Sequence, residues 1–431
     1  MQAGLSTKNA PSASVVLPHF AFGALAFLTA SVMLLFVSED LKNVQYFFSP
    51  HLLALTHILV LGWISMVIFG SLYQLIPVVM EVKLYSEKLA ISTFALFSSG
   101  LILLSASFWS FTFSHSLWME IGGGLVLLAI ILFAINAIKS AAKTERKTIE
   151  NTFIVTAVLW LLLTVILGLV IVFNFAFNFL SISHLQLLKT HAHMGLAGWF
   201  LLLVIGVASK LMPMFLIVHK LPTKLLNYSY FLINGGLVLL SLAYSFYPEK
   251  WLLALSGLLV VSGIILFLRF NQIAFGKRLR KKLDVGMKLS AMGFIMLALT
   301  ILLGLVSLFR PSFLQAFHLG TDVLYGITII LGFLTSLVLG QTYKTLPFII
   351  WLKYYHSKVG KGKVPLPQEL YSDKVANWHF YTYLIGMPIL IVGVFIGNVI
   401  TIQIAAVFII ITAVLYNYNV FKILFHKEKV Q

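Results

Sequence analysis

Two histidine residues lie at matching places inside two long apolar runs of this chain. His57 belongs to the run 52–79 and His193 to the run 190–216, each one or two helical turns from the outer end. An ionisable side chain at this depth is costly in a membrane, so it is by default a candidate functional residue. Imidazole is also the commonest metal ligand among side chains. His57 and His193 are therefore the leading candidate metal-binding residues.

The two histidines belong to an internal repeat. The segment from His57 through Gly62, Trp63 and Gly70 returns 136 residues later from His193 to Gly206, with a leucine and a proline following at the same offset. A third copy follows after another 134 residues and keeps the glycines and the proline as Gly332, Gly340 and Pro347. In this copy Ile327 stands at the histidine position, so we expect the third copy to carry no ligand.

Symmetry-related histidines on neighbouring parallel helices are expected to face one another. Two opposed imidazoles are what bis-histidine ligation of a b-type heme requires, so the sequence predicts heme b between His57 and His193. The alternative is that each imidazole only hydrogen-bonds a backbone carbonyl. The chain has no cysteine, which excludes thiolate-held iron–sulfur clusters and covalent heme attachment through cysteine.

His191 precedes His193 by two residues, which places the two side chains about 200° apart around an α-helix. They cannot both ligate one metal, so His191 either holds a second cofactor or lies hydrated at the outer interface. His318 and Asp322 have the spacing of an ion pair or of a metal-bound histidine oriented by a carboxylate. The competing interpretation, which also applies to Glu120, is a solvated interface. Five further histidines are expected in interfacial or loop positions: His19, His219, His356, His379 and His426.

The elements that must position these residues are membrane helices. The chain is 60% hydrophobic and only 10% charged, which is typical of an integral membrane protein. Apolar runs predict an all-α polytopic fold of about twelve transmembrane helices. We expect a single membrane domain over 1–431, built from three pseudo-symmetric four-helix repeats at approximately 16–138, 151–270 and 285–424. The predicted spans are 16–37, 52–79, 88–110, 117–138, 151–174, 190–216, 225–246, 251–270, 285–309, 319–350, 378–397 and 400–424.

The net charge of +17 is distributed unevenly across these spans. All but four of the 30 Lys and Arg residues fall on the side that holds both termini; the four are Lys42, Lys189, Lys250 and Arg310. The positive-inside rule therefore predicts cytoplasmic termini in a bacterial-type inner membrane. The basic run 277–282 is then interpreted as a topogenic and lipid-headgroup feature, with membrane lipids and no nucleic acid as partners.

The helix count and the segment Thr190-His191-Ala192-His193 through Trp199 to Pro213 resemble subunit I of the heme-copper oxidases and nitric oxide reductases, with a motif similar to the C-type oxidase branch. The resemblance implies that His191 binds a high-spin heme and His193 a low-spin heme, and Thr56-His57 resembles the helix carrying the opposite low-spin ligand. The motif stands in the second quartet, whereas the family has it in the third. The run 225–246 lacks the expected copper-binding histidines, so a divergent, NnrS-like relative fits better.

The expected function is therefore heme binding in electron transfer or in oxygen- or nitric oxide-related redox chemistry, with copper as a weaker expectation. An electron-donor protein or a quinol is an expected partner. Whether the chain is itself an oxidoreductase stays open. Two rival hypotheses also stay open: a transporter or channel whose polar pathway is lined by His57 and His193, and a scaffold subunit without a cofactor.

Overall fold

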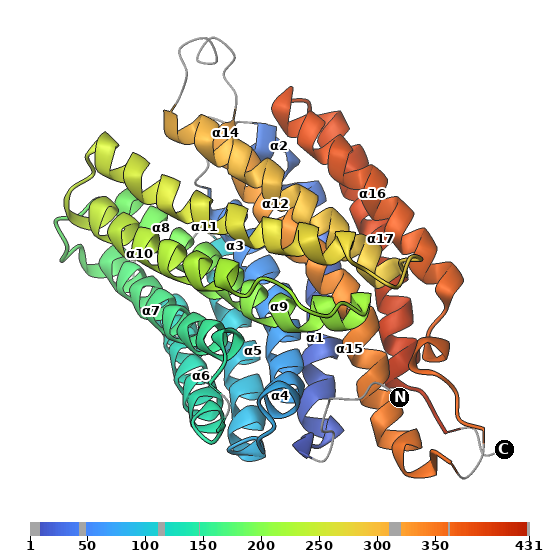
Figure 1. Ribbon diagram of the computed structural model, residues 1–431. Coiled ribbons are helices and arrows are strands. Elements are labelled where there is room, and N and C mark those ends of the chain that lie inside the picture. Colours follow the sequence, from blue (N-terminus) through green and yellow to red (C-terminus); the bar gives the residue numbers. More distant parts are fainter. Residues whose placement is uncertain are drawn as a thin grey trace. The chain divides into compact units, whose positions relative to one another are not determined.

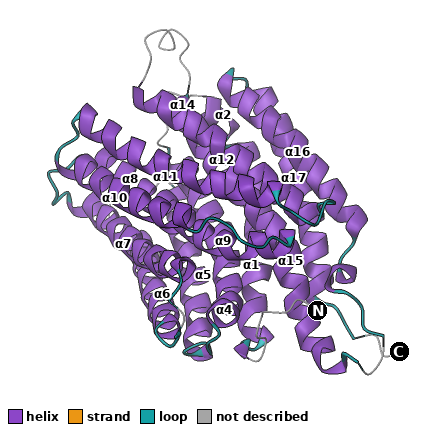
Figure 2. Cartoon of the chain, viewed as in Figure 1, coloured by secondary structure: helices purple, strands orange, loops and turns teal. Residues whose placement is uncertain are grey.

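The computed structural model describes residues 9–42, 49–110, 117–145, 147–309, 320–360 and 363–428. Within these ranges the chain is helical and contains no strand (Figure 2). Twelve of the described helices are long and apolar enough to cross a membrane, which confirms the predicted all-α polytopic fold. In chain order (Figure 1) these spans are α1 (Ala13–Phe36), Pro50–Val78, α5 (Glu87–Trp109), α6 (Leu117–Ala141), α7 (Ile149–Phe177), His184–Leu216, α10 (Lys224–Phe246), α11 (Lys250–Gly276), α12 (Val285–Phe309), Thr321–Lys358, α16 (Asp373–Phe395) and α17 (Val399–Leu424).

Most helix ends lie within a few residues of the predicted boundaries. The sixth span is an exception, because it begins at His184 and not near 190. Its first turns are polar, so an apolar run does not detect them. They are helical because Ser183 and Gln186 form a capping box, in which the Ser183 amide donates to Oε1 of Gln186.

The three helices that carry the repeated motif share an unusual backbone. Each is α-helical at its start, becomes π-helical, and then returns to α-helix. The π segments are η2 (Ile58–Ser65), η3 (Met194–Leu201) and η4 (Thr328–Leu334). They lie between α3 (Pro50–His57) and α4 (Met66–Met80), between α8 (His184–His193) and α9 (Leu202–Leu216), and between α14 (Thr321–Ile327) and α15 (Thr335–Tyr355). π-Helical segments are rare and occur frequently at functional sites.

The motif glycines make one contact that recurs in each of these helices. Gly70, Gly206 and Gly340 each face a carbonyl oxygen of the preceding long helix, where a Cβ would lie 3.2 Å or less from that oxygen. The oxygens belong to Val16, Glu150 and Gly286. Small residues let membrane helices approach this closely. The packing role expected of these glycines is confirmed, and a closed threefold ring of quartets remains a prediction.

The third and fourth helices of a predicted quartet also pair closely. α10 lies against α11, and α16 lies against α17 (Figure 1). Gly236 allows the first of these contacts, because its Cβ would lie 2.9 Å from the carbonyl oxygen of Ser256. In the second pair, a Cβ on Gly386 would lie 2.9 Å from Cβ of Phe408.

The described residues cluster into two compact units. The first comprises Met1–Ala10, Leu75–Ser107 and Thr112–Lys282, and the second comprises Pro11–Gln74, Phe108–Phe111 and Leu283–Gln431. The His191 and His193 helix thus belongs to the first unit, and His57 belongs to the second. The expected single domain of three repeats stays a prediction.

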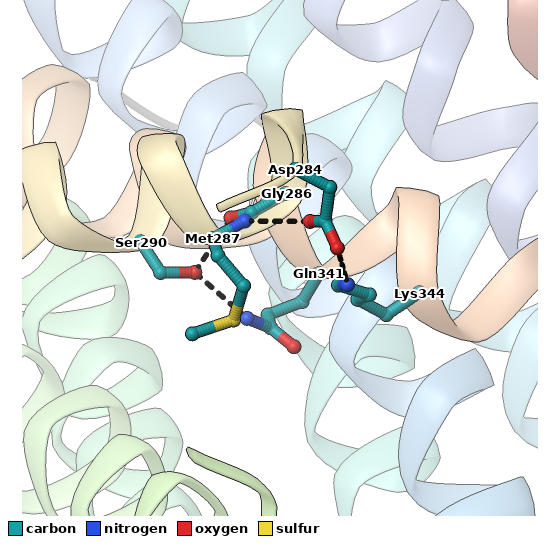
Figure 3. A network of polar contacts seen from close by, with 6 residues as sticks. All are labelled: Asp284, Gly286, Met287, Ser290, Gln341 and Lys344. Atoms are coloured by element: carbon teal, nitrogen blue, oxygen red, sulfur yellow. Dashed lines mark hydrogen bonds and ion pairs between the residues drawn. The ribbon is translucent and has the colours of Figure 1, made fainter. Parts of the chain in front are cut away.

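A polar network joins α12 to α15 within the second unit (Figure 3). Lys344 forms an ion pair with Asp284, and the other carboxylate oxygen of Asp284 accepts the backbone N–H of Met287 at 3.1 Å. Gln341 donates to Ser290 at 2.8 Å. Asp284 therefore caps the start of α12 and neutralises a half-buried lysine of the motif helix.

Candidate functional site

His57 and His193 occupy the same structural position in their helices. Each is the residue immediately before a π segment, and each ring is half-buried. Nδ1 of His57 donates to the carbonyl oxygen of Leu53, and Nδ1 of His193 donates to that of Lys189, both at 2.8 Å. Since a carbonyl oxygen only accepts hydrogen bonds, Nδ1 carries the proton in both rings. The neutral imidazole then has its lone pair on Nε2, the atom that ligates a metal.

An aromatic ring lies beside each of these imidazoles. The ring centroid of His57 is 4.9 Å from that of Phe108, and the centroid of His193 is 5.6 Å from that of Tyr244. Together with the backbone bond, such a neighbour limits rotation of the imidazole about its side-chain bonds. A fixed tautomer and a fixed ring direction are the usual supports of a metal-ligating histidine.

His191 turns to a different neighbour. Its Nδ1 donates to the carbonyl oxygen of Thr164 on α7 at 2.9 Å. His193 lies beside Tyr244 of α10, so the two histidines contact different helices, as their spacing predicted. His191 therefore also presents Nε2 with the lone pair, and it does so at a place separate from His193.

The sequence analysis did not anticipate what surrounds the His191 ring. Gly168 on α7 lies against it, and a Cβ at this glycine would be 2.8 Å from Cε1 of His191. Gly304 makes the equivalent contact with Tyr325 in the second unit, at 3.2 Å from Cε2. Gly168 and Gly304 are 136 residues apart, the same offset as the histidine motif, and this spacing was a usable signal.

The third copy of the motif has the backbone of the other two and different side chains. Ile327 precedes the π segment at the position of His57 and His193, and it is 7% exposed. Thr335 follows the segment and accepts a hydrogen bond from Trp63 Nε1 at 3.3 Å. Ile327 fills its position with apolar volume, so this copy presents no imidazole there.

The other candidates divide into several cases. His318 lies outside the described residues. Asp322 accepts a hydrogen bond from Ser307, and Glu120 is half-buried at the start of α6. The expectation of an interfacial position is wrong for His19 and His379, which are 0% exposed inside α1 and α16. Both are packed against tyrosine rings, which cover a histidine as effectively as aliphatic side chains do.

Among the described residues, no group of three or more His, Asp or Glu side chains converges on one point as a protein-only metal site requires. The three half-buried histidines each offer a single nitrogen. A single nitrogen per residue suits a cofactor that supplies its remaining ligands itself, as a porphyrin does.

Comparison with known proteins shows the fold. No family model matches the sequence, and no curated protein matches it either. Among solved structures, a heme-copper terminal oxidase whose dimer was determined by cryo-EM is similar, with a TM-score of 0.67. The similarity covers 97% of this chain and 85% of the oxidase chain, at 12% sequence identity. This chain therefore has the fold of a heme-copper oxidase chain over nearly its whole length.

Proposed function

We propose that this protein binds heme b in the membrane through His57 and His193 and takes part in electron transfer or in oxygen- or nitric oxide-related redox chemistry. The observation that carries the proposal is the matched state of the two histidines. Both stand directly before a π segment, both are half-buried, and both hold Nδ1–H on a carbonyl four residues earlier. The likeness of the fold to a heme-copper terminal oxidase supports the same cofactor class.

Each residue has a defined part in this proposal. His57 and His193 ligate the iron through Nε2, and the carbonyls of Leu53 and Lys189 hold the two rings in the required tautomer. A heme so held supplies one-electron redox chemistry. His191 is proposed as the ligand of a second heme, with its ring held by the Thr164 carbonyl.

The proposal includes the surroundings of the protein. It places the chain in a bacterial-type inner membrane with cytoplasmic termini, in contact with lipids and supplied with electrons by a donor protein or a quinol. Copper has weaker support, because the run 225–246 contains no histidine and the oxidase-like copper site needs several. Electron transfer is therefore the core of the proposal, and catalysis at a heme–copper pair is outside it.

A redox difference spectrum of the purified protein tests the proposal. We expect the reduced-minus-oxidised bands of a low-spin b-type heme. His57→Ala or His193→Ala should abolish or convert these bands, because each removes an axial ligand. Ile327→Val is the matched control at the equivalent position of the third copy and should leave the spectrum unchanged. Protein supplied with heme during expression that shows no heme bands would refute the proposal.

A further inference from the structure

Seven basic residues gather where three membrane spans end, and we call this set the basic patch. The span His184–Leu216 ends there, α10 begins there, and α11 ends there. The two connections, 217–223 and 277–283, contain no acidic residue. The members of the basic patch are Lys220, Lys224, Lys277, Arg278, Arg280, Lys281 and Lys282.

The second of these connections is held against the first. The backbone N–H groups of Leu279 and Arg280 both donate to the carbonyl oxygen of Leu216, at 3.2 and 3.4 Å. Leu216 is buried and is the last residue of α9. An unpaired carbonyl at a helix end is an ordinary place for such a bond. The basic connection is thus ordered on the end of the histidine-bearing span, and all of these residues belong to the first unit.

Apolar side chains project from the patch among its cations. Leu279 is 67% exposed and Ile217 is 48% exposed. Ile217 has φ 56° and ψ 59°, the left-handed conformation that a β-branched residue rarely adopts. A glycine would occupy this position without strain. The chain therefore keeps an exposed isoleucine at a conformational cost, next to a lysine cluster.

The combination of features identifies the ligand. Cations at the ends of membrane spans meet the phosphates of the lipid headgroups, and exposed Leu and Ile side chains at the same depth meet the start of the acyl chains. Guanidinium groups bind phosphate oxygens in a bidentate manner. We propose that the basic patch binds anionic phospholipids, with the phosphodiester held by the Lys and Arg side chains and with Ile217 and Leu279 inserted at the acyl boundary.

This site differs from a topogenic signal in what it requires. A topogenic run acts during insertion through its charge alone, and it needs neither an ordered backbone nor exposed apolar residues. A headgroup site needs cations that remain together in the folded protein. The two backbone bonds to Leu216 provide this, because they hold Arg280 and its neighbours beside the 217–223 connection.

Binding of fluorescent phosphatidylglycerol to the detergent-solubilised full-length protein tests the proposal, with phosphatidylcholine as the neutral lipid. The test variant combines Arg280→Gln, Lys281→Gln and Lys282→Gln. Each basic residue at an anionic surface contributes roughly a fivefold factor, so affinity for phosphatidylglycerol should fall on the order of 100-fold. Leu279→Asn should weaken binding of both lipids, because it removes apolar contact.

The matched control combines Lys363→Gln, Lys374→Gln and Lys422→Gln. These lysines are also exposed, and we expect them on the same membrane side, yet each has an acidic residue nearby in the sequence. The control should bind phosphatidylglycerol as the wild type does, and inorganic phosphate at millimolar concentration should not displace the lipid. Equal losses in both triple variants, or displacement by phosphate, would overturn the proposal. The wild-type protein gives an independent check that needs no variant: equal affinity for the two lipids at 0.1 M salt also overturns it.

Discussion

A Cβ atom on Gly168 would lie 2.8 Å from Cε1 of His191. Real Cβ atoms do not approach other atoms this closely, so only glycine fits while the imidazole keeps its place. The ring itself is held by the Thr164 carbonyl, which belongs to the same helix as Gly168. One turn of α7 therefore both receives the ring and sets its direction.

Gly168→Ala should displace the His191 ring and destabilise the protein. Overpacking costs about 1–3 kcal/mol, and the better helix propensity of alanine offsets about 1 kcal/mol of this. We expect a net loss of roughly 1 kcal/mol in thermal unfolding, and a change in any high-spin heme band. Gly304→Ala is the control, because its Cβ would lie at 3.2 Å from Tyr325, which a small ring shift accommodates. Identical behaviour of the two variants would contradict the positioning role.

The Asp284–Lys344 pair should contribute more than an exposed surface ion pair does. The Lys344 side chain is 14% exposed and that of Asp284 is 26% exposed. Lys344→Met leaves a partly buried carboxylate with less compensation, so we expect a loss of about 1–2 kcal/mol. Asp284→Asn should cost less than Asp284→Ala, because asparagine still caps α12 through Met287. Denaturation of the single variants and of the double variant Asp284→Asn/Lys344→Met measures the coupling, and additive losses would argue against the pair.

Ile217→Gly should stabilise the folded protein in detergent. Relief of a left-handed conformation is worth about 1–2 kcal/mol, part of which the flexibility of glycine in the unfolded chain takes back. Val218→Gly is the control, since Val218 has no positive φ, and it should destabilise the protein. Thermal melts of both variants decide the matter. A lower melting temperature for Ile217→Gly would show that the isoleucine is not strained.

The orientation of the chain is testable with reporter fusions. A reporter that is active only in an exported compartment should be inactive when fused after Lys282. The same reporter should be active after Lys250, which the distribution of Lys and Arg places on the opposite side. Activity after Lys282 would reverse the predicted map and both termini with it.

The helices were predictable because membrane burial is recorded in composition. A span must be apolar along its whole length, so the runs at 285–309 and 400–424 give helix ends close to those observed. The different directions of His191 and His193 were predictable because the residues between 184 and 193 form an α-helix, in which spacing fixes the angle.

Features that depend on tertiary packing were not predictable in this way. The burial of His379 results from Tyr343 and Tyr416, which come from two other helices. The π segments have no distinctive composition, since η2 and η3 are as apolar as the α-helix that follows each of them. Gly168 could be linked to His191 only after the two helices were seen together.

The π segments also determine how these helices can be probed residue by residue. An α-helix turns about 100° per residue, so a wheel drawn at that step assigns each side chain to a face. A π segment has a different angular step, and the faces after it no longer follow from the faces before it. Cysteine-scanning or cross-linking profiles of the three motif helices should therefore show one periodic pattern before residues 58, 194 and 328 and another, out of phase with it, after residues 65, 201 and 334. A single wheel fitted through a whole span would assign lipid-facing residues to the protein interior, so each half needs its own phase.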